Sequence, residues 1–176
     1  KNRIWYAGDV LQAAIGQSDN LFTPLQLAVY ASTIANDGTR MRAHFVKSVV
    51  SYNNNRVISE TAPKVMSTST ISHQAFDVVK DAMASVTRSS SSWRYFSDFS
   101  INVASKAGTP QVSGDTANST FICYAPAENP QIAVAVVIES GVWGVSSAPV
   151  ARAVLEEYFF GDSELIAPPA PNTLLQ

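Results

Sequence analysis

Three strand-like segments in the second half of the chain constrain its fold most strongly. Residues 101–107, 119–125 and 131–139 are rich in apolar, β-branched and aromatic side chains, and glycine or proline follows each segment within two residues. The connections between these segments are too short to hold the crossover helix that parallel neighbours require. We therefore predict a meander of three antiparallel strands.

A helix over residues 24–35 has complete start and stop signals. Thr23 is a suitable N-cap, Pro24 suits the first helical position, and Gln26 completes a capping box. The helix then ends at Asn36-Asp37-Gly38, because glycine readily adopts the left-handed conformation. The small residues inside this helix indicate close packing on another element.

Two more helices are predicted from apolar residues at helical spacing. One begins at Ser72, and the other spans residues 148–160. The apolar positions of the first are Phe76, Val79, Met83 and Val86. The apolar side of the second comprises Val150, Val154, Leu155 and Tyr158.

The remaining segments complete an α+β prediction: an antiparallel β-sheet with packed helices. Residues 44–52 and 56–59 flank three asparagines, which is typical of a β-hairpin with a polar turn. Residues 93–99 are aromatic-rich and irregular, and we expect a loop or lid there. We expect residues 1–166 to form one unit, followed by a proline-rich flexible tail over residues 167–176.

The composition narrows the classes of function. Of the 176 residues, 46% are hydrophobic and 15% are charged, and the net charge is −2. These values indicate a packed core and argue against a nucleic-acid surface. Lys and Arg are scattered singly, and the longest apolar run, 132–138, is strand-sized. We therefore expect neither a polybasic membrane segment nor a membrane helix in this chain.

Neither a metal site nor a cofactor is expected. The single Cys123 excludes an internal disulfide and a cysteine-based metal site, and its apolar neighbours indicate a buried structural thiol. His44 and His73 lie in different elements without clustered acidic residues. A glycine-rich phosphate loop is absent from the sequence.

One motif carries the functional signal. The segment Ser105-Lys106-Ala107-Gly108-Thr109-Pro110-Gln111 resembles the Lys-Thr/Ser-Gly-Thr box of penicillin-binding proteins and serine β-lactamases. Such a box is weak evidence alone, since Lys106 also fits an ordinary solvated strand lysine and Thr109-Pro110 a simple turn. Four further blocks, however, resemble class B penicillin-binding proteins in the family's order and spacing. They are residues 14–17 with 23–28, residues 34–38, residues 121–126 with 130–134, and residues 147–150.

The resemblance implies the C-terminal part of a transpeptidase domain, with a partial β-lactamase-like fold. The three strands would be the third to fifth of a five-stranded sheet. The parent protein would cross-link peptidoglycan by serine acyl transfer on D-Ala-D-Ala stem peptides, and β-lactams would acylate the same serine. It would work on the extracytoplasmic face of a bacterial membrane, anchored by an N-terminal helix outside this chain.

The resemblance also implies roles for the residues of the box. Lys106 would supply positive charge near the substrate carboxylate. Thr109 would give its backbone N–H to the oxyanion hole and its hydroxyl to the carboxylate. Gly108 would let the substrate approach the strand edge closely, because no Cβ intervenes. Ala107 replaces the family's Thr or Ser, so a hydrogen bond to the carboxylate worth roughly 1.5–3 kcal/mol is missing. We therefore expect weakened substrate or β-lactam binding in the parent.

Other motifs of the family are missing from this chain. No serine is followed by a lysine three positions later, so the nucleophile and its usual base are expected upstream, in the missing N-terminal half of the domain. Ser18-Asp19-Asn20 and Ser51-Tyr52-Asn53 match the S-x-N pattern away from the family position, and local turn bonding explains the first. Gly16-Gln17 is interpreted as a structural turn without a chemical role.

Two further expectations follow from these gaps. The alternative to an enzyme fragment is a degenerate, non-catalytic module that binds peptidoglycan peptide or a protein partner. Without the upstream half, apolar surface and a sheet edge would be exposed, which predicts self-association, for example as a homodimer.

Overall fold

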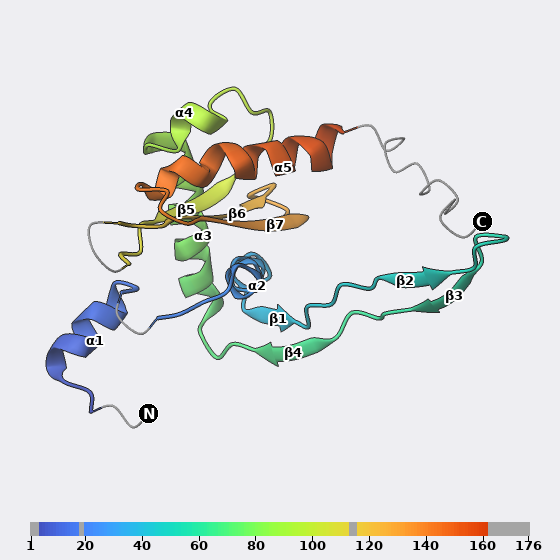
Figure 1. Cartoon of the computed structure of the whole chain (residues 1–176), viewed down its shortest axis with the longest axis horizontal. Helices are drawn as coiled ribbons and strands as arrows, with labels where there is room; N and C mark the ends of the chain where they lie inside the picture. Colours follow the sequence, from blue (N-terminus) through green and yellow to red (C-terminus); the bar gives the residue numbers. More distant parts are fainter. Residues whose placement is uncertain (1–3, 18–19, 113–115, 162–176) are drawn as a thin grey trace, which may run out of the picture.

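The predicted antiparallel meander is the centre of the structure. The computed structural model describes residues 4–17, 20–112 and 116–161, so the predicted tail lies outside the described residues. Strands β5 (Ala104–Gly108), β6 (Ser119–Ala125) and β7 (Ile132–Ile138) form an antiparallel sheet in the order β5-β6-β7. The prediction of an α+β fold is confirmed, because helices cover both faces of this sheet (Figure 1).

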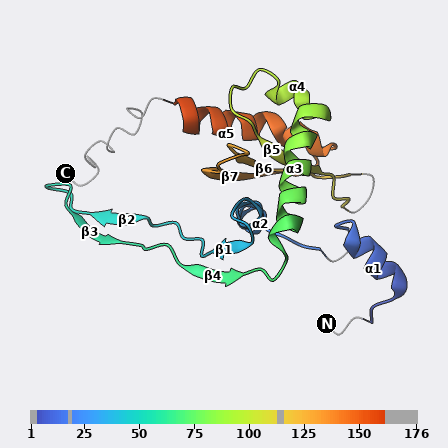
Figure 2. The ribbon, with the colours of Figure 1, turned by 180° about the vertical axis from the view of Figure 1, so that it is seen from behind.

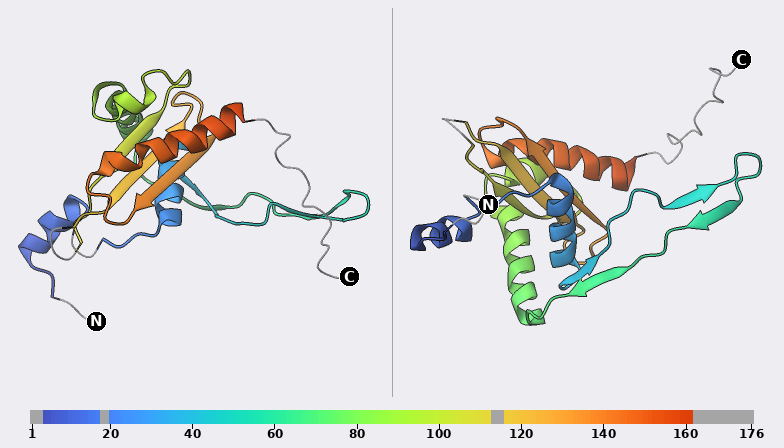
Figure 3. Two further views of the ribbon diagram at one scale, coloured as in Figure 1. Left: turned by 45° about the horizontal axis from the view of Figure 1, so that its top comes forward. Right: turned by 60° about the horizontal axis from the view of Figure 1, so that its bottom comes forward.

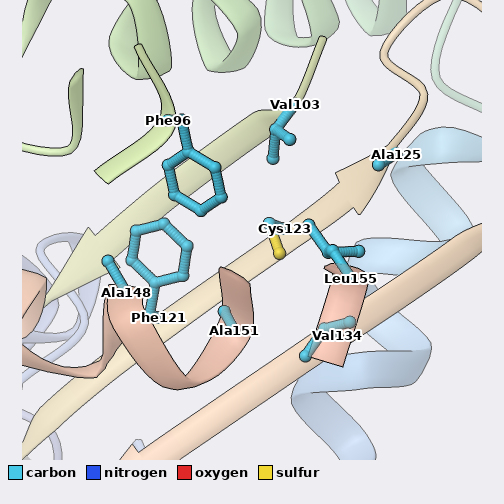
Figure 4. Close-up of a cluster of buried hydrophobic side chains, with 9 residues drawn as sticks. All are labelled: Phe96, Val103, Phe121, Cys123, Ala125, Val134, Ala148, Ala151 and Leu155. Carbon is cyan, nitrogen blue, oxygen red and sulfur yellow. The ribbon is translucent and has the colours of Figure 1, made fainter. Parts of the chain in front are cut away.

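Each face of the sheet has its own hydrophobic core. On one face lie α4 (Trp93–Phe96) and α5 (Ala148–Phe160), and on the other lie α2 (Pro24–Ala35) and α3 (His73–Ser89), as Figures 1 and 2 show. We call these the α5 core and the α2 core. The buried residues of the α5 core are Phe96, Val103, Phe121, Cys123, Ala125, Val134, Ala148, Ala151 and Leu155 (Figure 4). Those of the α2 core are Ala31, Ile34, Met83, Ala84, Ala104, Ile122 and Tyr124.

Cys123 lies within the α5 core, as the sequence predicted. Its side chain is fully buried, and this burial raises the pKa of the thiol to about 12. The thiolate is therefore absent near neutral pH, which confirms an inert structural thiol.

The signals of α2 are realised as predicted. The N–H of Gln26 donates to the Thr23 hydroxyl at 3.2 Å, and the N–H of Thr23 donates to the Gln26 side-chain oxygen at 2.8 Å. The helix ends at Ala35, and Gly38 has φ +84°. A Cβ on Gly38 would lie 2.7 Å from the Phe76 ring, so glycine is required both for its conformation and for the close packing of α3.

Helix α3 follows the predicted spacing in part. The Ser72 hydroxyl accepts from the Ala75 N–H at 3.3 Å, which confirms the start of the helix. Phe76 and Met83 are buried, whereas Val79 remains exposed. Helix α1 (Ala7–Ala14) was not predicted, and it contributes no buried residue.

The apolar side predicted for α5 is mostly wrong. Only Leu155 of the four predicted residues is buried; Val150, Val154 and Tyr158 are exposed. The helix instead packs through Ala148, Ala151 and Leu155, because the two alanines allow its backbone close to the sheet. Its outer face therefore carries an uncovered apolar stripe at i, i+4 spacing.

The segment 93–99 is packed against α5, and the expectation of a loop or lid is wrong. Phe96 is buried and its ring stacks on that of Phe121, with centroids 6.0 Å apart. Arg152 of α5 donates to the carbonyl of Tyr95 at 2.8 Å and pairs with the Asp98 carboxylate, whose pKa the hydrogen bond lowers. These contacts fix α4 over the sheet.

The predicted hairpin is the outer part of a long two-stranded arm. Strand β2 (Ser48–Val50) pairs with β3 (Val57–Glu60), and β1 (Thr39–Met41) pairs with β4 (Val65–Thr68). We call residues 39–68 the arm; it projects from the helices and sheet in Figure 3. Strand β2 is much shorter than the predicted segment 44–52, whereas β3 nearly matches the predicted 56–59, and both strand pairs of the arm contain a register shift. Between these two pairs, the two sides of the arm are joined by backbone hydrogen bonds: the Arg42 N–H donates to the Lys64 carbonyl, and the Thr61 N–H donates to the Lys47 carbonyl.

Substitution of adjacent residues tests which face of α5 is buried. Leu155→Ala removes a fully buried side chain, and we expect a loss of about 2–5 kcal/mol in the free energy of unfolding. The matched variant Val154→Ala alters an exposed side chain and is expected to cost less than about 1 kcal/mol. Urea unfolding of both variants measures the difference, and equal losses would contradict the observed face.

Candidate functional site

The box residues lie at the end of β5, the outer strand of the sheet. Within the described residues, β5 pairs only with β6, so its other long edge carries no strand. Its first half is anchored: Ala104 and Ser105 are buried, and the Ser105 hydroxyl lies 2.7 Å from that of Thr87 on α3. The second half emerges from this packing, since Lys106 is exposed and Ala107 and Gly108 are only half-buried.

Lys106 carries a positive charge that no described carboxylate neutralises. Its ammonium group donates to the carbonyl of the next residue, Ala107. The ion pairs among the described residues involve Lys80 and Arg152, which lie elsewhere. The charge of Lys106 is therefore available to an anion at the end of β5.

Thr109 is held by a backbone contact from the 3-10 helix η1 (Gly144–Ser147). The N–H of Gly144 donates to the Thr109 hydroxyl oxygen at 3.0 Å. Because this oxygen accepts, its own proton stays free to donate to another acceptor. The contact also fixes the direction of the Thr109 side chain.

The approach of η1 to β5 requires glycine at position 144. A Cβ there would lie 2.4 Å from the carbonyl oxygen of Gly108, far inside any normal contact. The Gly144 carbonyl lies 2.9 Å from the hydroxyl of Ser119 and 3.1 Å from that of Ser147. The two hydroxyls are 2.6 Å apart and fully buried. This buried network holds Gly144 against the strand end.

Gln17 also reaches the strand end, which the sequence interpretation missed. Its side-chain oxygen accepts from the Gln111 N–H at 3.3 Å, and its amide nitrogen lies 3.5 Å from the Thr109 carbonyl oxygen. Gly16 has φ +79°, which confirms the predicted turn. The available signal was the position of Gln17 in the block 14–17, which resembles the family. A cavity of about 580 Å³ lies between this segment and residues 108–112.

The structure also places the other motifs weighed from sequence. The Asn20 side chain donates to the Ala13 and Gln17 carbonyls at 2.9 and 3.1 Å, so local turn bonding explains it; Ser18 lies outside the described residues. Ser51 accompanies the hairpin turn of the arm, and its N–H donates to the Arg56 carbonyl. No three His, Cys, Asp or Glu side chains gather as metal ligands in residues 4–17, 20–112 and 116–161.

An antiparallel sheet with helices on both faces and a Lys-x-Gly-Thr outer strand is similar to solved transpeptidase structures, and this similarity gives the class of protein: a transpeptidase domain. Within this class, the chain belongs to the penicillin-binding proteins. Residues 1–156 match the family described as penicillin binding protein transpeptidase domain. The resemblance inferred from the sequence blocks is thereby confirmed.

Relatives and solved structures agree with this assignment. The chain is 27% identical over 181 aligned positions to peptidoglycan D,D-transpeptidase MrdA of Escherichia coli K12, covering 93% of this chain and 28% of that protein. It is similar to the imipenem acyl-enzyme complex of M. tuberculosis penicillin-binding protein A, with a TM-score of 0.74, 31% identity, and coverage of 84% of this chain and 33% of that one. For Pseudomonas aeruginosa PBP2 in complex with WCK 5153, the TM-score is 0.76, the identity 30% and the coverage 92% and 36%.

The chain spans 20% to 30% of the length of three curated relatives, one of which is MrdA with 28%. None of the helices in the described ranges is both long and apolar enough to cross a membrane. The roles of Lys106, Ala107, Gly108 and Thr109 remain predictions from the resemblance.

Substituting Gly144 tests how the strand end is held. Gly144→Ala places a methyl group on the Gly108 carbonyl, and we expect a loss of about 1–3 kcal/mol in the free energy of unfolding. Amide hydrogen exchange at Gly108 and Thr109 should accelerate at the same time. Gly8→Ala is the matched control because no atom lies within 4 Å of its added Cβ. Unchanged exchange at Gly108 in Gly144→Ala would contradict the proposed close contact.

Proposed function

We propose that this chain forms the substrate-binding wall of a peptidoglycan D,D-transpeptidase, whose remaining parts lie outside it. The single observation that carries the proposal is the end of β5. There an unpaired lysine and a directed threonine hydroxyl flank a glycine on a strand edge that pairs with no other described strand.

This geometry suits a peptide that ends in a carboxylate. An extended peptide can lie along an unpaired strand edge and bond to its backbone. Lys106 would attract the terminal carboxylate, and the free proton of the Thr109 hydroxyl would donate to it. The half-buried Gly108 presents no side chain between the peptide and the strand.

The reaction proposed for the parent is a two-step acyl transfer. A serine outside this chain attacks the carbonyl between the two D-alanines, and the terminal D-alanine leaves with a proton. An amine of a neighbouring stem peptide then displaces the serine and forms the cross-link. The backbone N–H of Thr109 would stabilise the oxyanion in both steps. β-Lactams would acylate the same serine, as the imipenem acyl-enzyme of the M. tuberculosis relative supports.

We propose that the parent acts on the extracytoplasmic face of a bacterial membrane. Peptidoglycan is assembled there, and the relatives carry names of peptidoglycan transpeptidases. An N-terminal membrane helix outside this chain would anchor the protein.

Acylation of the full-length parent by a fluorescent penicillin tests the proposed roles. Lys106→Ala should lower the acylation rate about tenfold or more, because a charge-assisted hydrogen bond is lost. Ala107→Thr should raise the rate about tenfold by restoring a hydroxyl. Lys64→Ala is the control for Lys106, since it removes another exposed lysine from the distant arm.

Ala107→Val is the control for the hydroxyl, because valine has the shape of threonine without its polar group. The side chain at position 107 packs partly against the α5 core, so shape alone has an effect that this control measures. Equal rates for the Thr and Val variants would contradict the role of the missing hydroxyl. A parent that no penicillin acylates would favour the non-catalytic module instead.

The exposed surface of the chain supports a further proposal about its partners. The residues of α1 and the outer face of α2 are largely exposed, and a cavity of about 760 Å³ between α2 and the base of the arm is lined by Phe22, Leu25, Tyr30, Met41 and Met66 among others. We propose that the remaining part of the domain covers this surface in the parent.

When the chain is isolated, a second copy would cover the same surface or the free edge of β5. We therefore expect a homodimer in sedimentation experiments at micromolar concentration. A monodisperse monomer would count against this self-association.

A further inference from the structure

The arm carries a net positive charge, although its Lys and Arg residues are not adjacent in the sequence. Residues 39–68 contain five Lys or Arg residues and one acidic residue, whereas the rest of the chain contains seven Lys or Arg and thirteen Asp or Glu. The chain is therefore divided into a positive arm and a negative remainder. The five basic residues are Arg40, Arg42, Lys47, Arg56 and Lys64.

These basic side chains are exposed and free of acidic partners among the described residues. The ion pairs of the described ranges involve only Lys80 and Arg152. Among the five, Arg40 donates a side-chain hydrogen bond to the hydroxyl of Ser67. Most of the arm's charge is thus neither neutralised nor held in a fixed direction.

Apolar side chains are interleaved with this charge. Phe45 is 92% exposed, Tyr52 84% and Ile58 66%, and every residue of β2, β3 and β4 is exposed. Both faces of the ribbon are therefore uncovered over its outer length, away from the sheet and helices (Figure 3). A two-stranded ribbon of this kind is marginal in water on its own, so burial of its apolar side chains would stabilise it.

We propose that the arm binds the surface of a bilayer that contains anionic phospholipids. Lys47, Arg56 and Lys64 of its outer part would contact the phosphate headgroups, and Phe45, Tyr52 and Ile58 would enter the interfacial region. The inference rests on the proposed extracytoplasmic location only for the presence of a membrane nearby. Its test requires no acylation, so the two proposals fail separately.

A fluid anionic surface suits the arm better than a folded protein partner. Protein interfaces concentrate their binding energy in a central cluster of anchoring residues surrounded by a polar rim. On the arm, apolar and basic residues are instead spread along the ribbon, with side chains that lack fixed partners. Many equivalent headgroups can meet such a distribution without matching it in shape.

The division of charge between the arm and the rest of the chain also sets how the chain would be oriented on the bilayer. An anionic surface attracts the arm and repels the remainder of the chain. The arm would therefore contact the bilayer first and hold the sheet with Lys106 away from it.

Vesicle flotation with the whole 176-residue chain tests the proposal. We expect binding to vesicles that contain phosphatidylglycerol, and at least tenfold weaker binding to pure phosphatidylcholine vesicles. High salt should reduce binding, because the headgroup contacts are electrostatic. Amide hydrogen exchange should slow over residues 42–64 on the anionic vesicles and stay unchanged in α3 and α5.

Two double variants with the same change in net charge separate the arm from the rest. Lys47→Glu with Arg56→Glu reverses two charges of the arm, and we expect at least a tenfold loss of binding, since each basic residue near an anionic surface contributes about fivefold. Arg88→Glu with Arg94→Glu reverses two exposed charges outside the arm and should change binding less than about threefold. Phe45→Ser with Ile58→Ser should remove the binding that persists at high salt.

Several results would overturn the proposal. Equal binding to both kinds of vesicle, or equal losses in the two charge variants, would exclude a role for the arm's charge. If amide exchange over residues 42–64 of the unmodified chain did not slow on anionic vesicles, the arm would be excluded as the contact. This measurement needs no variant, so it holds even if a variant fails to fold. A dimer in the absence of vesicles that the Lys47 and Arg56 changes dissociate would identify a second copy as the occupant.

Discussion

The contact between Gly144 and Gly108 is the constraint on which the candidate site depends. It brings η1, which leads into α5, against the end of β5, and the Gly144 N–H donates to the Thr109 hydroxyl. Only glycine allows this approach, and the buried hydroxyls of Ser119 and Ser147 hold its carbonyl from the other side. The position of the exposed Thr109 hydroxyl is thus determined by the buried packing of η1 against β5 and β6.

The first residues of β5 are buried and held in place, whereas the end of the strand is accessible. Ser105 is buried and in contact with Thr87 of α3, and one residue later Lys106 is exposed. Gln17 bridges to Thr109 and Gln111 from a segment far away in the sequence. A strand held at both ends in this way is suited to present a substrate-binding edge with little rearrangement, which is the condition for effective stabilisation of a transition state. The arm differs in every respect, because it projects, exposes its side chains and lacks tertiary packing along its outer length.

The sequence predicted the elements whose signals are local. The cap formed by Thr23 and Gln26, the start of α3 at Ser72 and the three strands of the meander all depend on neighbouring residues. The sequence-based prediction was wrong where tertiary packing determines which side chains are buried. Alanines rather than valines face the sheet in α5, because close approach outweighs side-chain hydrophobicity there, and the aromatic segment 93–99 packs onto Phe121 rather than forming a lid. For the site, the box was found through its resemblance to a family, but the contacts of Gln17 and Gly144 join distant segments that no local pattern connects.

The central claim is that this chain supplies the substrate strand and not the nucleophile. Its most direct test is to acylate the full-length parent with a β-lactam and locate the modified serine by peptide mass spectrometry, with the isolated chain treated in parallel. We expect the modification on a serine outside these 176 residues and none on the isolated chain. A β-lactam adduct on any serine within this sequence, in the parent or in the isolated chain, would contradict the account.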